Sequence, residues 1–297
     1  MLNSAQLKGN MGQEAASATL LIDCPDQRGL VASIANFLYK HGGNILHADQ
    51  HQDRELGLFF MRVEWDLKDF DLSRAEFVKS FSPLAESLQM NWRISYSDQP
   101  RRVAILVSHY LHCLVDLLHR IKIQELRCKL AVIVSNHCDA RPLAEFYGVP
   151  YEFVSFEESS KDQVEKKQLE ILRRYDVSVV VLARYMRILS PDFVAQFPNR
   201  IINVHHSFLP AFVGSKPYHA AHTRGVKLIG ATSHYATAEL DQGPIIEQDV
   251  TRISHRDSPQ DLIGKGRDLE KMVLARAVRW HLEDRLLCYG NKTVVFD

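Results

Sequence analysis

Residues 177–184, Val-Ser-Val-Val-Val-Leu-Ala-Arg, hold the longest apolar run of the chain and predict a buried strand. Shorter apolar runs recur on both sides of it, separated by stretches with helical spacing. The other strands are expected at residues 103–108, 130–135, 151–156, 201–204, 229–235 and 245–250, and the helices at residues 111–121, 141–147, 159–175, 191–197 and 259–285. Apolar strands that alternate with helices are typical of a parallel sheet covered on both faces. This part of the chain is therefore predicted to be an α/β domain with a mostly parallel sheet.

The first part of the chain has a different order of elements. A β-type run starts at Ala18, and residues 23–29 form a turn rich in Pro, Asp and Gly. A helix at residues 30–39 is ended by residues 42–44, Gly-Gly-Asn, because these residues tolerate the left-handed cap conformation. Further strands are expected at residues 45–51, 57–65 and 91–96, and a second helix at residues 73–90. The order βαββαβ predicts a small ferredoxin-like split-βαβ sandwich.

A polar, proline-bearing segment separates the two patterns. We place a linker at residues 98–102, between a first domain at residues 18–97 and a second at residues 103–297. Residues 1–17 are expected to be a mobile tail. The length of 297 residues is sufficient for two domains, each with its own core.

The composition excludes several classes of protein. Lys+Arg and Asp+Glu both number 36, so the formal net charge is zero and no nucleic-acid-binding surface is indicated. The five cysteines form no C-x-x-C pair, which indicates reduced thiols in a cytoplasmic protein. Residues 1–17 lack the pattern of a secretory signal, and no apolar run approaches the length of a membrane span. Neither nucleic acid nor a membrane is therefore expected as a partner.

The densest polar cluster in an apolar setting lies in residues 201–210, Ile-Ile-Asn-Val-His-His-Ser-Phe-Leu-Pro. Asn203 and His205 are two residues apart, so on a strand they project from one face and His206 projects from the other. At the carboxyl end of a parallel strand, such a face looks into the crevice where α/β proteins bind ligands. Asp241, in a tight turn, adds a rigidly held carboxylate. An amide donor, an imidazole and a carboxylate are the groups that an acyl transfer needs.

Each of these residues also has a structural interpretation. Asn203 can satisfy backbone groups at a strand end, and Asp241 can form an Asx turn. His219 and His222 lie three residues apart and could share a helical face as metal ligands, but no third ligand follows in a known spacing. The catalytic interpretation is favoured because the motifs occur together, and no metal site is predicted.

Three motifs in order resemble the formyltetrahydrofolate-using transformylase family. They are residues 183–190, Ala-Arg-Tyr-Met-Arg-Ile-Leu-Ser, then Asn203-x-His205-x-Ser207-x-Leu209-Pro210, then Asp241-x-Gly243-Pro244. The resemblance extends from about residue 103 to the C-terminus and implies a Rossmann-like formyltransferase fold. It further implies a set of residues that bind the folate, namely Met186, Arg187, Leu189, Gly214 and Gly243.

Three departures indicate which branch of the family is closest. Residues 108–112, Ser-His-Tyr-Leu-His, contain no glycine where ribonucleotide-accepting members have a turn that cradles a phosphate. The chain ends at Asp297, which leaves no room for the RNA-binding domain of tRNA-formylating members. Residues 18–97 resemble an ACT domain, and residues 203–219 resemble the formyltetrahydrofolate deformylases. The implied reaction is hydrolysis of 10-formyltetrahydrofolate to tetrahydrofolate and formate, which balances one-carbon pools for purine synthesis.

The resemblance also implies roles for individual residues. Asn203 donates to the developing oxyanion, charged His205 assists it and protonates the leaving nitrogen, and Asp241 orients the water or takes its proton. No metal and no cofactor beyond the folate substrate is expected. The ACT-like domain implies a homo-oligomer, a dimer or tetramer, and a possible amino-acid effector bound by Asp26, Arg28, Gly29 and Asn44. Two alternatives stay open: a transformylase that acts on a small amine, and a non-catalytic folate or amino-acid sensor.

Overall fold

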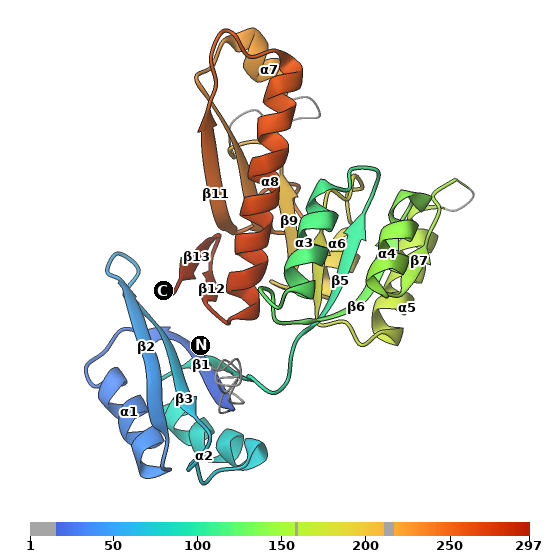
Figure 1. Ribbon diagram of the computed structural model, residues 1–297. Coiled ribbons are helices and arrows are strands. Elements are labelled where there is room, and N and C mark those ends of the chain that lie inside the picture. Colours follow the sequence, from blue (N-terminus) through green and yellow to red (C-terminus); the bar gives the residue numbers. More distant parts are fainter. Residues whose placement is uncertain (1–15, 158–159, 211–216) are drawn as a thin grey trace, which may run out of the picture. The chain divides into compact units, whose positions relative to one another are not determined.

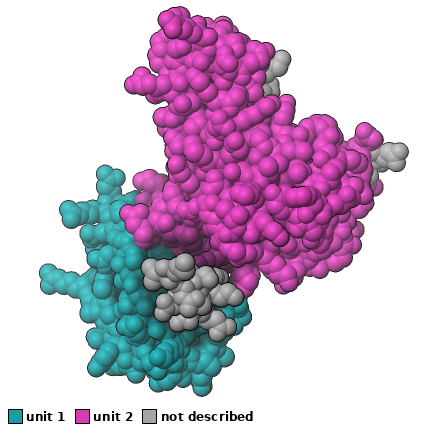
Figure 2. Space-filling view, viewed as in Figure 1, with its two compact units in different colours: residues 1–99 teal, residues 100–297 magenta. Residues whose placement is uncertain are grey.

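The computed structural model describes residues 16–157, 160–210 and 217–297 (Figure 1). The chain divides into two compact units, Met1–Gln99 and Pro100–Asp297 (Figure 2). Within the described ranges, no helix combines the length and apolar character needed to cross a membrane. All five cysteines are free thiols.

The first unit is a four-stranded antiparallel sheet with two helices. The strands are β1 (Ser17–Pro25), β2 (Asn44–Asp53), β3 (Leu58–Asp66) and β4 (Asn91–Tyr96), and the helices are α1 (Leu30–Lys40) and α2 (Arg74–Ser87). The strand order is β2-β3-β1-β4. A capping box starts α2, because the Ser73 side chain accepts from the backbone N–H of Glu76 and Glu76 reciprocates. The predicted βαββαβ arrangement is confirmed.

Both helices of this unit bury their apolar faces on the sheet. Ile34 and Leu38 of α1 and Phe77 and Phe81 of α2 join one core with alternate residues of β1 and β3. The rings of Trp65 and Phe77 stack with their centroids 5.5 Å apart. Aromatic packing of this kind adds to the burial of apolar area, so the unit has a core of its own.

The second unit contains a seven-stranded sheet. Its strands are β5 (Arg102–Val107), β6 (Lys129–Ser135), β7 (Tyr151–Phe153), β8 (Val179–Leu182), β9 (Ile201–His205), β10 (Leu228–Tyr235) and β11 (Ile245–Arg252). The order is β11-β10-β9-β8-β5-β6-β7, parallel from β7 through β9, with β10 and β11 antiparallel. The predicted, mostly parallel sheet is therefore confirmed.

Helices cover both faces of this sheet. They are α3 (His112–Lys122), the short 3₁₀ helix η1 (Cys138–Ala140), α4 (Arg141–Tyr147), α5 (Lys161–Arg174), α6 (Pro191–Ala195), α7 (Pro217–Arg224) and α8 (Pro259–Leu282). Val103, Ile105 and Val107 of β5 pack with α3, α4 and α8, whereas Ala104 and Leu106 pack with α5 and α6. Because successive residues serve opposite cores, the strands read as continuous apolar runs.

Several boundaries differ from the sequence prediction. Strand β1 starts at Ser17, inside the expected tail, and continues to Pro25, into the first residues of the expected turn, because it pairs with β3 along its whole length. Strand β8 is shorter than residues 177–184, since the chain turns at Arg184 with a φ of 60°. Helix α7 and the terminal hairpin β12 (Leu286–Tyr289) and β13 (Lys292–Val295) were not predicted. These short elements carry too little periodic apolar pattern to be recognised.

Candidate active site

The end of β9 presents two of the predicted residues to a cavity. Ile202 and Val204 belong to the core beneath α3 and α8, so the alternating side chains of Asn203 and His205 face the other way. Both line a cavity of about 360 Å³. His205 is 7% exposed and Asn203 is half-buried. The strand therefore holds an amide and an imidazole on one face, next to the sheet edge where α/β proteins bind ligands.

The loop between β10 and β11 brings Asp241 to the same cavity. Asp241 has a φ of 55°, a left-handed conformation that Asp tolerates better than most residues. Its Oδ2 lies 3.2 Å from Nδ1 of His205, and its Oδ1 lies 3.5 Å from Nε2 of His234. One carboxylate thus bridges two imidazoles, and the Nδ1–H of His205 donates to it.

His234 belongs to the same cluster of side chains, and the sequence analysis did not predict it. Residues 203 and 234 are direct partners in the antiparallel pairing of β9 with β10, so their side chains share a face. Nδ1 of His234 lies 2.9 Å from the carbonyl oxygen of Tyr235, and its Nε2 lies 3.2 Å from Nδ2 of Asn203. Nε2 accepts from the Asn203 amide while the ring is neutral and donates to Asp241 when it is protonated. This contact uses one N–H of Asn203 and leaves the other for a ligand.

The electrostatics of the cluster keep Asp241 ionised. Burial alone would raise the pKa of Asp241, but hydrogen bonds from His205 and His234, with their positive charge, outweigh it and hold the pKa far below its ordinary value. Nε2 of His205 is buried and has no hydrogen-bond partner among the described residues. Because Nδ1–H is held by Asp241, a neutral His205 has its lone pair on Nε2, where it can take a proton.

The low pKa of Asp241 predicts a specific dependence of stability on pH. A carboxyl with a lowered native pKa contributes its full stabilisation above its unfolded pKa of about 3.9 and loses it as the pH falls towards the native value. The free energy of unfolding of the wild type should therefore exceed that of Asp241→Asn near neutral pH. This difference should stay constant down to about pH 5 and shrink as the pH falls further to about 3 in chemical denaturation. A difference that stays constant over this lower range would contradict the assignment.

The segment that follows β8 forms one side of the cavity. Residues 184–189 line it, including Met186, Arg187 and Leu189, and so do residues 236–241. The backbone N–H of Met186 donates to Oγ of Ser108 over 3.1 Å, and the guanidinium of Arg187 lies over the ring of Phe156 at 4.5 Å. These contacts fix the course of the segment, so its backbone groups can serve a flat heterocycle. Gly214 lies outside the described residues.

His206 also lines the cavity, contrary to the expected opposite orientation. Strand β9 ends at His205, so the alternation of a strand no longer applies to the next residue. Its ring meets that of Tyr218 edge-on, with centroids 6.0 Å apart. The sequence could not predict that His206 faces the cavity, because the last residue of the strand cannot be located from the motif alone.

Gly243 does not line the cavity; it lies against strand β10. A Cβ at this position would lie 1.8 Å from the carbonyl oxygen of Tyr235. Any side chain here must push the turn away from the strand, and Asp241 is only two residues away. Because Gly243 has no side chain, the turn can pack closely against β10, and this packing fixes the position of the Asp241 carboxylate.

This close approach predicts a large loss of stability for Gly243→Ala. Because the clash is with backbone, we expect the free energy of unfolding to fall by about 3 kcal/mol. Gly264→Ala is the matched control, since a Cβ there meets nothing within 4 Å inside α8. That control should be about 0.5–1 kcal/mol more stable than wild type in urea unfolding. Equal effects of the two substitutions would refute this explanation of Gly243.

A second buried ion cluster lies under the segment that follows β5. The carboxylate of Glu270 in α8 is 2.7 Å from Nε2 of His112, 2.8 Å from the hydroxyl of Tyr218 and 3.4 Å from Nε of Arg184. Burial would raise the pKa of Glu270, but the hydrogen bond from His112 and the charge of Arg184 outweigh it and lower the pKa. Through these contacts, Glu270 of α8 links α3 and α7 to Arg184, the first residue of the segment at residues 184–189 that lines the cavity.

Two groups of described residues have the composition of a metal site. They are His109, His137 and Asp139, and His112, Cys113 and Glu270. In each group the ligand atoms lie within 4.8 Å of one another. His219 and His222, which the sequence singled out as a possible pair, belong to neither group.

In the first unit, a separate cavity of about 560 Å³ lies between α1 and the end of β2. Asp26 and Gly29 line it, together with Gln50, His51 and Gln52. Gly29 has a φ of 90° and directly precedes α1. Two other expected effector residues, Arg28 and Asn44, are not among the residues that line this cavity.

Comparisons with known proteins agree with this arrangement. Residues 101–278 match the family Formyl transferase, and residues 18–75 match the family ACT domain. A formyltetrahydrofolate deformylase of Synechocystis sp. is 57% identical over 280 residues, which cover 94% of this chain and 98% of that protein. The Bacillus subtilis formyltetrahydrofolate deformylase is 50% identical and covers 94% and 93% of the two chains.

Solved structures give the same assignment. A formyltetrahydrofolate deformylase from Pseudomonas syringae pv. tomato superposes with a TM-score of 0.94 at 49% identity, covering 96% of each chain. Glycinamide ribonucleotide transformylase 1 from Symbiobacterium toebii is more distant, with a TM-score of 0.65 and 31% identity over 68% of this chain and 97% of that chain. The likeness to the deformylases spans both units, whereas the transformylase matches about two thirds of the chain. The chain therefore belongs to the formyltetrahydrofolate deformylase family.

Proposed function

We propose that this protein hydrolyses 10-formyltetrahydrofolate to tetrahydrofolate and formate in the cytoplasm, and so balances one-carbon pools for purine synthesis. The main support for this proposal is that Asn203, His205 and Asp241 line the same cavity. The chain is also 57% identical to a formyltetrahydrofolate deformylase. The segment at residues 184–189 gives the cavity a side that can take the pterin ring. No metal or cofactor besides the folate substrate enters this reaction.

In the proposed mechanism, His205 is the proton carrier. Its Nε2 takes a proton from water as the water oxygen bonds to the formyl carbon. The free N–H of Asn203 donates to the oxyanion that develops on the formyl oxygen. When the carbon–nitrogen bond breaks, His205 returns the proton to the leaving nitrogen, and formate departs. Asp241 stays ionised, holds the tautomer of His205 and stabilises its imidazolium form. Its lowered pKa makes Asp241 itself a poor base.

The segment at residues 108–112 supports water as the acceptor. The Ser108 hydroxyl donates to Oδ1 of Asn136 over 2.8 Å and accepts from Met186, and His112 contacts Glu270. These polar groups are used within the protein, and the segment has no glycine nest for a phosphate. A phosphate-bearing amine therefore finds no prepared site there.

The experiment is an assay of formate release in a buffer that contains no primary amine. The hydrolase predicts formate and tetrahydrofolate in equal amounts with wild-type protein alone. Turnover that starts only after addition of an amine would establish the transformylase alternative. Folate binding without any turnover would establish the sensor alternative.

For the first unit, we propose that the 560 Å³ cavity binds a small amino acid that modulates activity in a homo-oligomer. Asp26 can accept from an ammonium group, and the chain at Gly29 approaches a ligand with little steric hindrance. Calorimetric titration of the full chain with glycine and with methionine should give heat with at least one of them. The absence of heat with both would contradict this role.

A further inference from the structure

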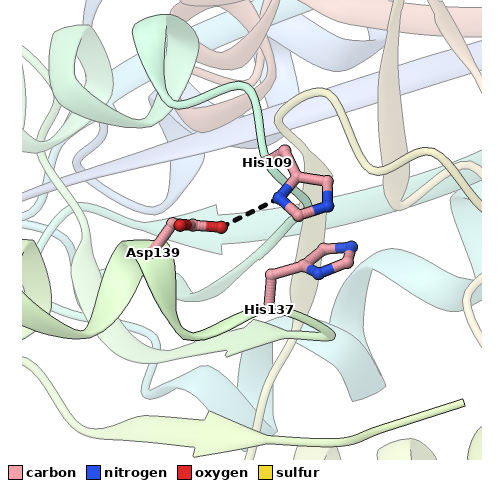
Figure 3. A group of neighbouring side chains, drawn as sticks. All are labelled: His109, His137 and Asp139. Atoms are coloured by element: carbon pink, nitrogen blue, oxygen red, sulfur yellow. Dashed lines mark hydrogen bonds and ion pairs between the residues drawn. The ribbon is translucent and has the colours of Figure 1, made fainter. Parts of the chain in front are cut away.

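Three side chains of types that ligate metals meet outside the cavity described above: His109 on the loop after β5, His137 on the loop after β6, and Asp139 in η1. Nδ1 of His109 lies 2.9 Å from Oδ2 of Asp139, and the rings of His109 and His137 stack with centroids 3.3 Å apart (Figure 3). The side chains of His109 and Asp139 are 62% and 51% exposed. An ion in solvent can therefore reach them without any opening of the fold.

The hydrogen bonds around His137 keep its Nε2 unprotonated. Oγ of Ser108 accepts from the backbone N–H of Met186, so its own hydrogen is donated to Oδ1 of Asn136. The amide of Asn136 is thereby oriented with Nδ2 towards Nε2 of His137, 3.0 Å away. Since Nδ2 only donates, Nε2 of His137 accepts from it and is unprotonated, and an ion that binds Nε2 takes the place of this hydrogen bond.

The spacing of the three side chains suits a small divalent ion. One ligand atom from each lies within 4.8 Å of the other two. A tetrahedral zinc ion with bonds of about 2.0–2.1 Å spaces its ligand atoms roughly 3.4 Å apart. The two imidazole rings must rotate out of their stacked arrangement to direct one nitrogen lone pair each at a common ion, and the exposure of His109 and Asp139 leaves room for this rotation. The carboxylate supplies the negative charge that a dication needs beside two neutral imidazoles.

We propose that His109, His137 and Asp139 bind one Zn²⁺ or a similar divalent transition metal, with a fourth position open to water. Two imidazoles and one carboxylate form a donor set that suits zinc and its neighbours in the transition series.

A bound ion would link the loop after β5 to the loop after β6. Ser108 and Asn136, whose side chains are hydrogen-bonded to each other, directly precede two of the ligands. Oγ of Ser108 also accepts from the backbone N–H of Met186, so this link stabilises the segment at residues 184–189 that lines the folate cavity. The site has no part in the hydrolytic chemistry.

The test is equilibrium dialysis of the full chain, without an affinity tag, against an equimolar concentration of Zn²⁺ after removal of metals with a chelator. We expect about one zinc per chain by elemental analysis. His109→Gln and His137→Gln should each weaken binding about tenfold or more, as loss of a ligand requires. His255→Gln is the matched control, because His255 is an exposed histidine on a different loop, and it should bind zinc as wild type does.

Two results would overturn the proposal. The first is an absence of retained zinc in the wild type. The second is zinc that binds equally well to both glutamine variants, which would place it at another site such as His112, Cys113 and Glu270. Substitution by Co²⁺ separates these sites, because the proposed ligands are nitrogen and oxygen only. A thiolate-to-cobalt charge-transfer band would assign the ion to a cysteine site and contradict the proposal.

Discussion

Replacing Asp241 with Asn is expected to lower kcat by about 10³–10⁴-fold while the affinity for folate stays within a few-fold of the wild type. The carboxylate accepts from Nδ1–H of His205 and so keeps the lone pair on Nε2. An asparagine can instead donate to Nδ1, which moves the proton to Nε2 and removes the base. The cavity segment at residues 184–189 is untouched, so the binding of the substrate should persist.

Single-turnover rates and fluorescence titration with a folate analogue separate these two effects. Asp257→Asn is a suitable control, because Asp257 is another turn carboxylate whose pKa is lowered by hydrogen bonds, first from Lys265 and then from Ser254. It does not line the catalytic cavity, and its kcat should match that of the wild type. If Asp241→Asn kept a wild-type kcat, the proposed proton path would be wrong.

Replacing Asn203 with Ala is expected to lower kcat by about 10²–10³-fold, which is the usual cost of one oxyanion donor. One N–H of its amide contacts His234, and the second is the donor that the mechanism assigns to the formyl oxygen. Because this contact strengthens as charge develops, the loss should appear in kcat much more than in KM.

Ser233→Ala is the control for this effect. The Ser233 hydroxyl donates to the backbone carbonyl of Asn203 over 2.8 Å, so its removal perturbs the same strand without removing the amide. A kcat within about fivefold of wild type is expected for it. Equal losses in the two variants would mean that Asn203 acts through the geometry of β9 and not as a donor.

Much of the fold could be predicted from the sequence because its signals are local. The apolar runs at residues 103–108 and 130–135 mark strands that are buried on both faces. Helix α7 and the hairpin β12–β13 were missed because short elements depend on tertiary packing. Tyr218 of α7, for example, is held by Glu270 and packs where Gly266 leaves room.

The candidate site could be predicted only in part. Asn203 and His205 are two residues apart on one strand, so their proximity follows from local geometry. His234 could not be found this way, because its place depends on the register of β10 against β9. Glu270 reaches His112 across 158 positions of sequence, and no local pattern encodes such a contact.

Single-turnover hydrolysis in water enriched in the heavy oxygen isotope tests the central claim most directly, namely that the formyl group at Asn203, His205 and Asp241 is passed to water. Wild-type protein with 10-formyltetrahydrofolate and no amine should release formate that carries one solvent oxygen. The Asp241→Asn variant should form the same product about 10³–10⁴-fold more slowly. Formate without solvent oxygen, or a formyl group recovered on an amine of the protein or buffer, would contradict the account.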